Sequence, residues 1–198
     1  MRLIENLEIV KLSNLDYQYK VKAVKLFVDG FYKIFSFSKD KKILQELFLH
    51  SLDFSMIYVC LFENNVVGFL GIGNNIKRPI FFDKSICQKL LGKGKGYIVH
   101  KQMSYIMEKQ TVRGEKDVYI DYLTTDKKYR GEGIATKLIN FVFNELDFEE
   151  CYIEVLSKNK NAKRLYEKIG FEEYKRIYNP FIMLQGLGFF IEMKRHIK

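Results

Sequence analysis

The sequence predicts one α/β (α+β) domain, because strand patterns and helix patterns both occur along its 198 residues. Residues 117–125 are rich in β-branched and aromatic side chains, which is typical of a strand. After a glycine turn, apolar residues recur between Ile134 and Leu146 at the spacing of one helix face. Two apolar runs, 56–62 and 66–72, are separated by a short polar stretch, which indicates a β-hairpin. A chain of this length is long enough to bury a core of its own.

A strand and two helices are predicted before the hairpin. Residues 7–12 alternate between apolar and polar side chains, as in a strand. Asn14 or Asp16 can cap the first helix, and the second helix follows Ser38. The side chains expected to face the core are Val21, Val24, Val28, Phe31, Tyr32 and Phe35 from the first helix, and Ile43, Leu44, Leu47 and Phe48 from the second.

Residues 74–116 carry the weakest patterns in the chain. Residues 82–91 predict a helix, and residues 97–110 predict a second helix of weaker pattern. Between them lies a run of alternating glycine and lysine at 92–96. Because this run does not follow a strand, it predicts a flexible turn and not a phosphate site.

The end of the chain predicts two more strands. Residues 172–178 alternate as a strand, Asn179-Pro180 starts a loop, and residues 188–194 form the last strand. No internal repeat, low-complexity stretch or linker interrupts the chain. We therefore expect one domain over residues 1–198.

The net charge of +9 attracts polyanions, which include nucleic acid, acidic partners and phosphate-bearing coenzymes. No aromatic-and-basic RNA signature and no recognition-helix motif is present, which argues against nucleic acid. Two basic clusters, at 127–130 and 158–164, lie beside the glycine turn and a later motif. Positive charge there would favour the binding of a phosphate group.

The three cysteines, Cys60, Cys87 and Cys151, have no metal-ligand spacing, so we expect buried free thiols and no metal. An odd number of cysteines favours a reducing cytoplasm. No apolar run is long enough to span a bilayer, and the first six residues lack the features of a signal peptide. The sequence therefore predicts a cytoplasmic protein without a membrane partner.

The glycine turn, residues 129–135, predicts an anion site. A helix start presents unpaired backbone N–H groups and the positive end of the helix dipole. Gly131 and Gly133 let a ligand approach the backbone closely. The Gly-Lys-Ser/Thr ending of a P-loop is missing, and Thr136 stands where a dinucleotide fingerprint needs its third glycine.

What remains is Arg-x-x-Gly-x-Ala from Arg130 to Ala135. It resembles the acyl-CoA pyrophosphate loop of the GCN5-related N-acetyltransferase (GNAT) superfamily. Residues 153–171 resemble a second motif of the same superfamily, a strand followed by Asn-x-x-Ala-x-x-Leu-Tyr-x-Lys-x-Gly-Phe. Two motifs in the right order, one helix apart, identify residues 117–171 as the core coenzyme motifs.

This resemblance implies the GNAT fold. The fold has a central mixed, mostly antiparallel sheet of six to seven strands, with helices on both faces and a splay between the fourth and fifth strands. It also implies acetyl-CoA as co-substrate, bound partly as an added strand. The coenzyme-binding residues that it implies are Leu123, Thr124, Thr125, Arg130, Gly131, Glu132, Gly133, Ile134, Ala135, Asn159, Ala162 and Tyr166. We expect the Glu132 side chain to point to solvent, away from the pyrophosphate.

The resemblance also implies chemical roles. Tyr166 matches the general acid that protonates the CoA thiolate, although its spacing also fits core packing. Asn159 matches a coenzyme contact, and it also fits a plain helix cap. Glu154 matches the proton acceptor of ribosomal-protein N-terminal acetyltransferases. Asp121 is the alternative base, with Tyr119 on the same strand face, and a water chain could replace both.

The sequence therefore predicts an acetyl-CoA-dependent N-acetyltransferase that acts on a primary amine. A small amine, an antibiotic, a protein N-terminus and a lysine all remain open as acceptor. The general base, the role of residues 74–116 and a homodimer are open as well. The alternatives are a non-catalytic acyl-CoA-binding module, against which Tyr166 argues, and a nucleic-acid-binding protein.

Overall fold

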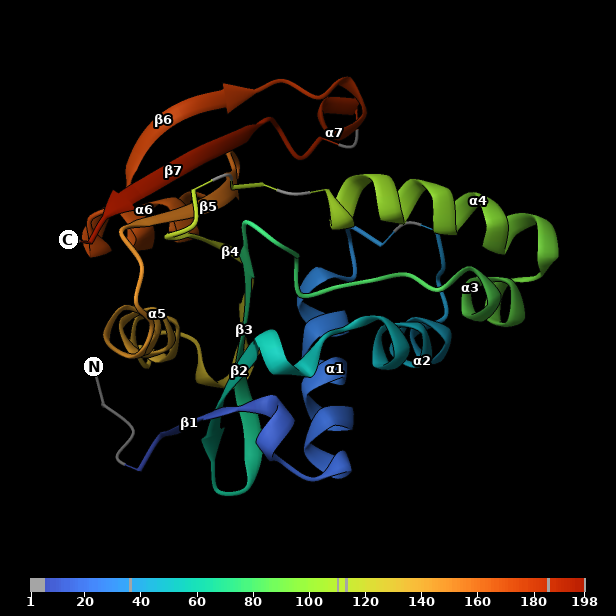
Figure 1. Cartoon of the computed structure of the whole chain (residues 1–198), viewed down its shortest axis with the longest axis horizontal. Coiled ribbons are helices and arrows are strands. Elements are labelled where there is room, and N and C mark those ends of the chain that lie inside the picture. The colour runs from blue at the N-terminus through green and yellow to red at the C-terminus, as the bar shows by residue number, and fades with distance from the viewer. Residues whose placement is uncertain (1–5, 36, 110, 113, 185, 198) are drawn as a thin grey trace.

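The predicted strands assemble into a seven-stranded sheet with the order β1-β2-β3-β4-β5-β7-β6 (Figure 1). The computed structural model describes residues 6–35, 37–109, 111–112, 114–184 and 186–197. The strands are β1 (Glu8–Lys11), β2 (Ile57–Phe62), β3 (Asn65–Asn74), β4 (Asp117–Thr125), β5 (Glu150–Leu156), β6 (Glu172–Ile177) and β7 (Phe190–His196). The β4–β5 pair is parallel and every other strand pair is antiparallel, so the predicted mixed sheet is confirmed.

The predicted splay between the fourth and fifth strands is also confirmed. β4 and β5 pair only as far as Ile120 and Ile153. Beyond these residues β4 continues to Thr125 and β5 to Leu156, with no register partners between the two. The sheet therefore opens along the carboxyl-terminal halves of two neighbouring parallel strands.

Helices cover both faces of the sheet. They are α1 (Tyr17–Phe31), α2 (Lys41–Ser51), α3 (Lys84–Leu91), α4 (Lys93–Met103), α5 (Ile134–Glu145), α6 (Lys160–Ile169) and α7 (Pro180–Leu184), with a π-helical segment η3 (Ser104–Glu108) after α4. Figure 1 shows α5 on one side of β2, β3 and β4 and α1 on the other. Each face therefore has its own apolar cluster.

The cluster under α1 and α2 is built around Phe27. Its ring meets Phe48 and Tyr122 edge-on, each at 5.0 Å between centroids. Leu138 of α5 and Tyr166 of α6 belong to the cluster on the other face. Burying a phenylalanine stabilises the fold by roughly 1.5–3 kcal/mol, so the first cluster holds the amino-terminal helices firmly on the sheet.

Three local predictions are wrong. The turn expected at residues 92–96 is confined to Gly92, which has a φ of 85°, and residues 93–96 open α4. The reason is packing: a Cβ on Gly96 would lie 2.3 Å from the Cys87 carbonyl oxygen, so glycine lets α4 approach α3. Val21 is 39% exposed and does not face the core. Pro180 begins a short helix, because proline suits a first helical position.

Other predictions are confirmed. The hairpin turns at Glu63-Asn64, both with positive φ, as a tight two-residue turn requires. Cys60, Cys87 and Cys151 are buried free thiols. No helix among the described residues is long and apolar enough to cross a membrane. The helix predicted at 97–110 is observed as part of α4 and η3, and its last residue lies outside the described residues.

Candidate active site

The glycine loop between β4 and α5 takes a backbone conformation that favours glycine. Gly131 has a φ of 89° and Gly133, the N-cap of α5, has a φ of 77°. An L-residue is strained there by roughly 1–2 kcal/mol, which explains both glycines. A Cβ at either position would meet no atom within 4 Å, so space lies open beside this backbone. The loop therefore has the geometry and the room of an anion site at a helix start.

Glu132 meets the expectation of a solvent-facing side chain only in part. Its Oε2 atom is shielded from solvent and has no hydrogen-bond donor in the described part of the chain. One of the two carboxylate oxygens therefore does not face solvent, although the residue as a whole is partly exposed. The carboxylate lies one residue before the N-cap of α5, where the positive end of the helix dipole favours a negative charge.

The free edge of β4 is the second part of the site. Leu123, Thr124 and Thr125 pair with β3 on one side only, and the other side faces the opening toward β5. The Thr124 side chain packs against Gly30 of α1, where a Cβ would lie 2.3 Å from Thr124 Oγ1. This contact leaves the backbone of the strand, rather than that side chain, for a ligand in the opening.

The third part is α6. Asn159 is its N-cap, and the Asn159 carboxamide oxygen accepts a hydrogen bond from the Ala162 N–H at 3.3 Å. The capping interpretation of Asn159 is therefore confirmed, whereas its contact with the coenzyme stays a prediction. Tyr166 is the buried residue of this helix, and its ring meets Phe171 edge-on at 6.1 Å. Burial raises the pKa of the Tyr166 phenol, so the hydroxyl stays protonated at neutral pH.

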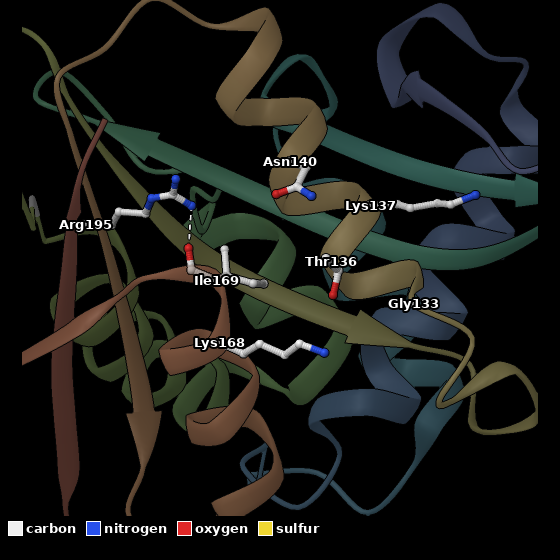
Figure 2. Close-up of a pocket in the computed structure, with 7 residues that line it drawn as sticks. All are labelled: Gly133, Thr136, Lys137, Asn140, Lys168, Ile169 and Arg195. Carbon is white, nitrogen blue, oxygen red and sulfur yellow. Dashed lines mark hydrogen bonds between the residues drawn. The ribbon is translucent and has the colours of Figure 1, made fainter. Parts of the chain in front are cut away.

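A cavity of about 410 Å³ lies between α5 and α6 (Figure 2). Its lining residues are Gly133, Thr136, Lys137, Asn140, Lys168, Ile169 and Arg195. Figure 2 shows the Lys168 side chain extending toward the first turn of α5, while Arg195 donates a hydrogen bond to the Ile169 carbonyl. The cavity thus adds positive charge from three separate elements next to the glycine loop. Lys168 stands within the second motif but carried no predicted role, and Arg195 was missed because no sequence motif links β7 to α5.

Glu154 lies on the opposite face of the sheet from Tyr166. Ile153 and Val155 belong to the cluster under α5 and α6, and strand alternation turns Glu154 to the other face. Burial, and then the nearby Glu192 carboxylate, raise the pKa of Glu154 to about 7. No described residue donates a hydrogen bond to the Glu154 side chain. Such a carboxylate can exchange a proton near neutral pH.

Asp121, the alternative base, is held by an ion pair. It lies where the β3–β4 register shifts, and its side chain is fully buried against Arg78, which is itself only 11% exposed. Burial raises the pKa of Asp121 to about 6 in spite of this partner. The sequence-predicted acids therefore differ: Asp121 has an ion-pair partner and Glu154 has none among the described residues. No group of three metal-ligating side chains is found in the described part of the chain.

Comparison with known proteins identifies the class to which this fold and site belong. Residues 21–171 match the family described as Acetyltransferase (GNAT) family. The N-alpha-acetyltransferase MAK3 of Arabidopsis thaliana is 34% identical over 108 residues, which are 52% of this chain and 53% of that protein. An N-acetyltransferase from Staphylococcus aureus Mu50 superposes with a TM-score of 0.63 at 17% identity, covering 95% of this chain and 100% of that one. A chain of the NatC complex bound to Gag peptide and CoA superposes with a TM-score of 0.60 at 15% identity, covering 97% and 99%.

The chain belongs to the GNAT acetyltransferase family. The predicted family is thus confirmed, and the predicted class, an acetyl-CoA-dependent N-acetyltransferase, is the class of this family. The two structures share less than a fifth of their residues with this chain and support the fold alone. The aligned region spans about half the length of the curated relatives, 47% of one and 53% of another.

Proposed function

We propose that this protein transfers the acetyl group of acetyl-CoA to the N-terminal amine of a protein or peptide. The observation that carries the proposal is the opening between β4 and β5, which begins after Ile120 and lies beside Glu154. The family match supports the transfer reaction. The relatives described as N-alpha-acetyltransferases support this acceptor over a free small amine, an antibiotic or a lysine side chain.

Coenzyme binding follows from the three parts of the site. The pyrophosphate fits the N–H groups of residues 130–135, where two glycines with positive φ leave the backbone open. The pantetheine arm fits the free edge of β4 at residues 123–125, as an added strand. Lys137, Lys168 and Arg195 supply positive charge to the nucleotide end of the coenzyme.

The transfer then needs a base and an acid. The N-terminal ammonium gives one proton to Glu154, directly or through water, and the neutral amine nitrogen attacks the thioester carbonyl carbon. The C–N bond forms and the C–S bond breaks. The departing thiolate takes the proton of the Tyr166 hydroxyl, the second proton of the nitrogen passes through solvent to the tyrosinate, and Glu154 releases its proton to solvent. The net products are the acetylated amine, CoA and one proton.

Glu154 and Tyr166 suit these tasks because they lie on opposite faces of the sheet. One group can then face the incoming amine while the other faces the leaving sulfur. Glu154 is preferred to Asp121 as the base because Asp121 already accepts hydrogen bonds from Arg78. A cytoplasmic location remains part of this proposal.

The test is an acetyl-CoA turnover assay that follows thiol release over a panel of amines. The panel pairs each peptide that has a free N-terminus with the same peptide N-formylated, and adds lysine peptides and small amines. Mass spectrometry locates the acetyl group. Turnover of the free-N-terminus peptides alone supports the proposal. Turnover of lysine peptides or small amines would contradict the proposed acceptor and assign a different one. Coenzyme binding without turnover of any amine identifies a non-catalytic acyl-CoA-binding module instead.

A further inference from the structure

Arg78 joins the weakly patterned segment 74–116 to the strand that lines the opening. Its Nε donates to Asp121 Oδ1 at 2.6 Å, and its Nη2 contacts the same oxygen. Its Nη1 donates to the carbonyl oxygens of Ile106 at 3.2 Å and Lys109 at 3.5 Å. The guanidinium also lies 5.7 Å from the centre of the Tyr119 ring. One side chain thus ties the end of η3 to β4.

This ion pair is not explained by stability alone. Removing two charges from water is costly, and well-packed apolar residues of similar size often replace a buried pair without loss. The pair also sits at the register shift of β4, next to the residue where β4 and β5 cease to pair. The Asp121 Oδ2 atom is buried and has no hydrogen-bond donor among the described residues. A buried charged group therefore lies at the opening, and its hydrogen bonding is only partly satisfied by the described residues.

We propose that Arg78 is a positioning residue that gives the two buried acids different roles: it holds Asp121 as an ion-pair partner and leaves Glu154 to accept the proton. This inference rests on the proposed acetyl transfer. The bonds to Ile106 and Lys109 have a second consequence, because they fix the end of η3 against the opening.

The charges around Glu154 determine how Arg78 acts on it. Glu192 from β7 and Asp121 from β4 raise the pKa of Glu154, whereas Arg78 and Lys175 from β6 lower it. Tyr119 and Tyr174 also interact electrostatically with Glu154. Lys175 is largely exposed, with 58% of its side chain accessible, so solvent screens its charge. Arg78 is the buried cation that favours ionisation of Glu154 near neutral pH.

The test compares pH profiles of kcat/KM for wild type, Arg78→Met, Arg78→Lys, Asp121→Asn and Glu154→Gln. Arg78→Met should move the acid limb to higher pH, since Glu154 loses the cation, and Arg78→Lys should restore part of the shift. Asp121→Asn should move the limb to lower pH and keep kcat within about tenfold of wild type. Glu154→Gln should lose about a hundredfold or more, as removal of a general base does.

Lys77→Met is the matched control, because it removes the neighbouring positive charge from an exposed pair with Asp53 and should shift nothing. Loss of kcat in Asp121→Asn with activity kept in Glu154→Gln would make Asp121 the base and overturn the inference. If the acid limb of the kcat/KM profile stays in place in Arg78→Met and Asp121→Asn, or shifts identically in both, the ion pair has only a structural role. Thermal melts and acetyl-CoA binding identify any variant that fails to fold.

A second readout separates this inference from the proposed function. Carbon-13 NMR titration of the carboxyl groups measures the Glu154 pKa in the free protein, with no turnover. Opposite shifts in Arg78→Met and Asp121→Asn support the electrostatic role even if no amine is acetylated. Absence of both shifts contradicts it even if the wild-type protein is an active acetyltransferase.

Discussion

Glu154 lies directly opposite Glu192 in the antiparallel pair of β5 and β7. Like charges at directly opposed positions destabilise a sheet, so this arrangement needs a reason. Glu192 is partly neutralised by Lys175, whose Nζ lies 3.4 Å from Glu192 Oε2. Glu154 has no such partner among the described residues, and burial and then the Glu192 charge raise the pKa of Glu154. A proton acceptor for an ammonium group benefits from a pKa near the working pH.

Replacing Glu192 by glutamine should lower the pKa of Glu154, because the like charge that raises it is removed. If ionised Glu154 is needed for turnover, the acid limb of the kcat/KM profile then moves to lower pH. Glu173→Gln is the matched control, since it removes an equal charge that is already paired with Arg176 on β6. An acid limb that stays in place in Glu192→Gln would argue that Glu154 is not the titrating group.

Glu154→Gln should make the protein more stable at pH 8 while it removes activity. The folded-state pKa of Glu154 is raised from 4.5 to about 7, so the folded protein holds this proton more tightly than the unfolded chain. The favourable contribution of Glu154 to the free energy of unfolding is present at low pH and is lost as pH rises from about 4.5 through about 7. The melting temperature of Glu154→Gln should therefore exceed that of wild type more at pH 8 than at pH 5. An equal difference at both pH values contradicts the raised pKa.

Tyr166→Phe should lower kcat and leave the affinity for acetyl-CoA nearly unchanged. Phenylalanine keeps the edge-on contact with Phe171 and the packing of α6, so only the donor hydroxyl is lost. A loss of about a hundredfold is expected for removal of a general acid. Product formation in single-turnover experiments measures the chemical step directly. Unchanged kcat would assign Tyr166 to packing alone.

Gly133→Ala should destabilise the protein by roughly 1–2 kcal/mol and weaken acetyl-CoA binding, because alanine is strained at a φ of 77°. Gly94→Ala is the matched control. Gly94 lies in α4 with no atom within 4 Å of an added Cβ, and alanine favours a helix by up to about 1 kcal/mol. Denaturant unfolding and calorimetric titration with acetyl-CoA measure both effects. Equal destabilisation by the two substitutions contradicts the prediction.

Glu132→Gln should tighten acetyl-CoA binding, since it removes a negative charge beside the loop where the pyrophosphate is expected. The carboxylate is shielded on its Oε2 side and is not fully hydrated, so its repulsion is only partly screened. Titration at low and high salt should give a larger gain at low salt. A weaker complex would mean that Glu132 instead shapes the loop.

The sequence by itself determined the family, most of the elements, and the positions of the glycine loop and the helix cap in the candidate site. Those parts depend on the backbone conformation and on short-range hydrogen bonds, and both leave recognisable patterns in the sequence. Gly131 and Gly133 satisfy positive φ, Asn159 caps a helix, and alternating side chains mark each strand. The sequence pattern was a weaker guide where a residue is required by its packing against residues that are distant in the sequence. Gly96 read as a turn because its packing partner, the backbone of Cys87, lies on another helix.

Only the tertiary structure gave a physical reason to separate the two acids. The sequence favoured Glu154 through a family resemblance and kept Asp121 as the alternative, and nothing marked Arg78 as a partner of either. The ion pair joins residues 43 positions apart, and the opposition of Glu154 and Glu192 requires β7 to lie beside β5. Such long-range contacts set burial and nearby charge, and these two quantities decide the pKa of a carboxylate. The motifs therefore located the candidate site, and the packing of the sheet distinguished the acid held in an ion pair from the one with no such partner among the described residues.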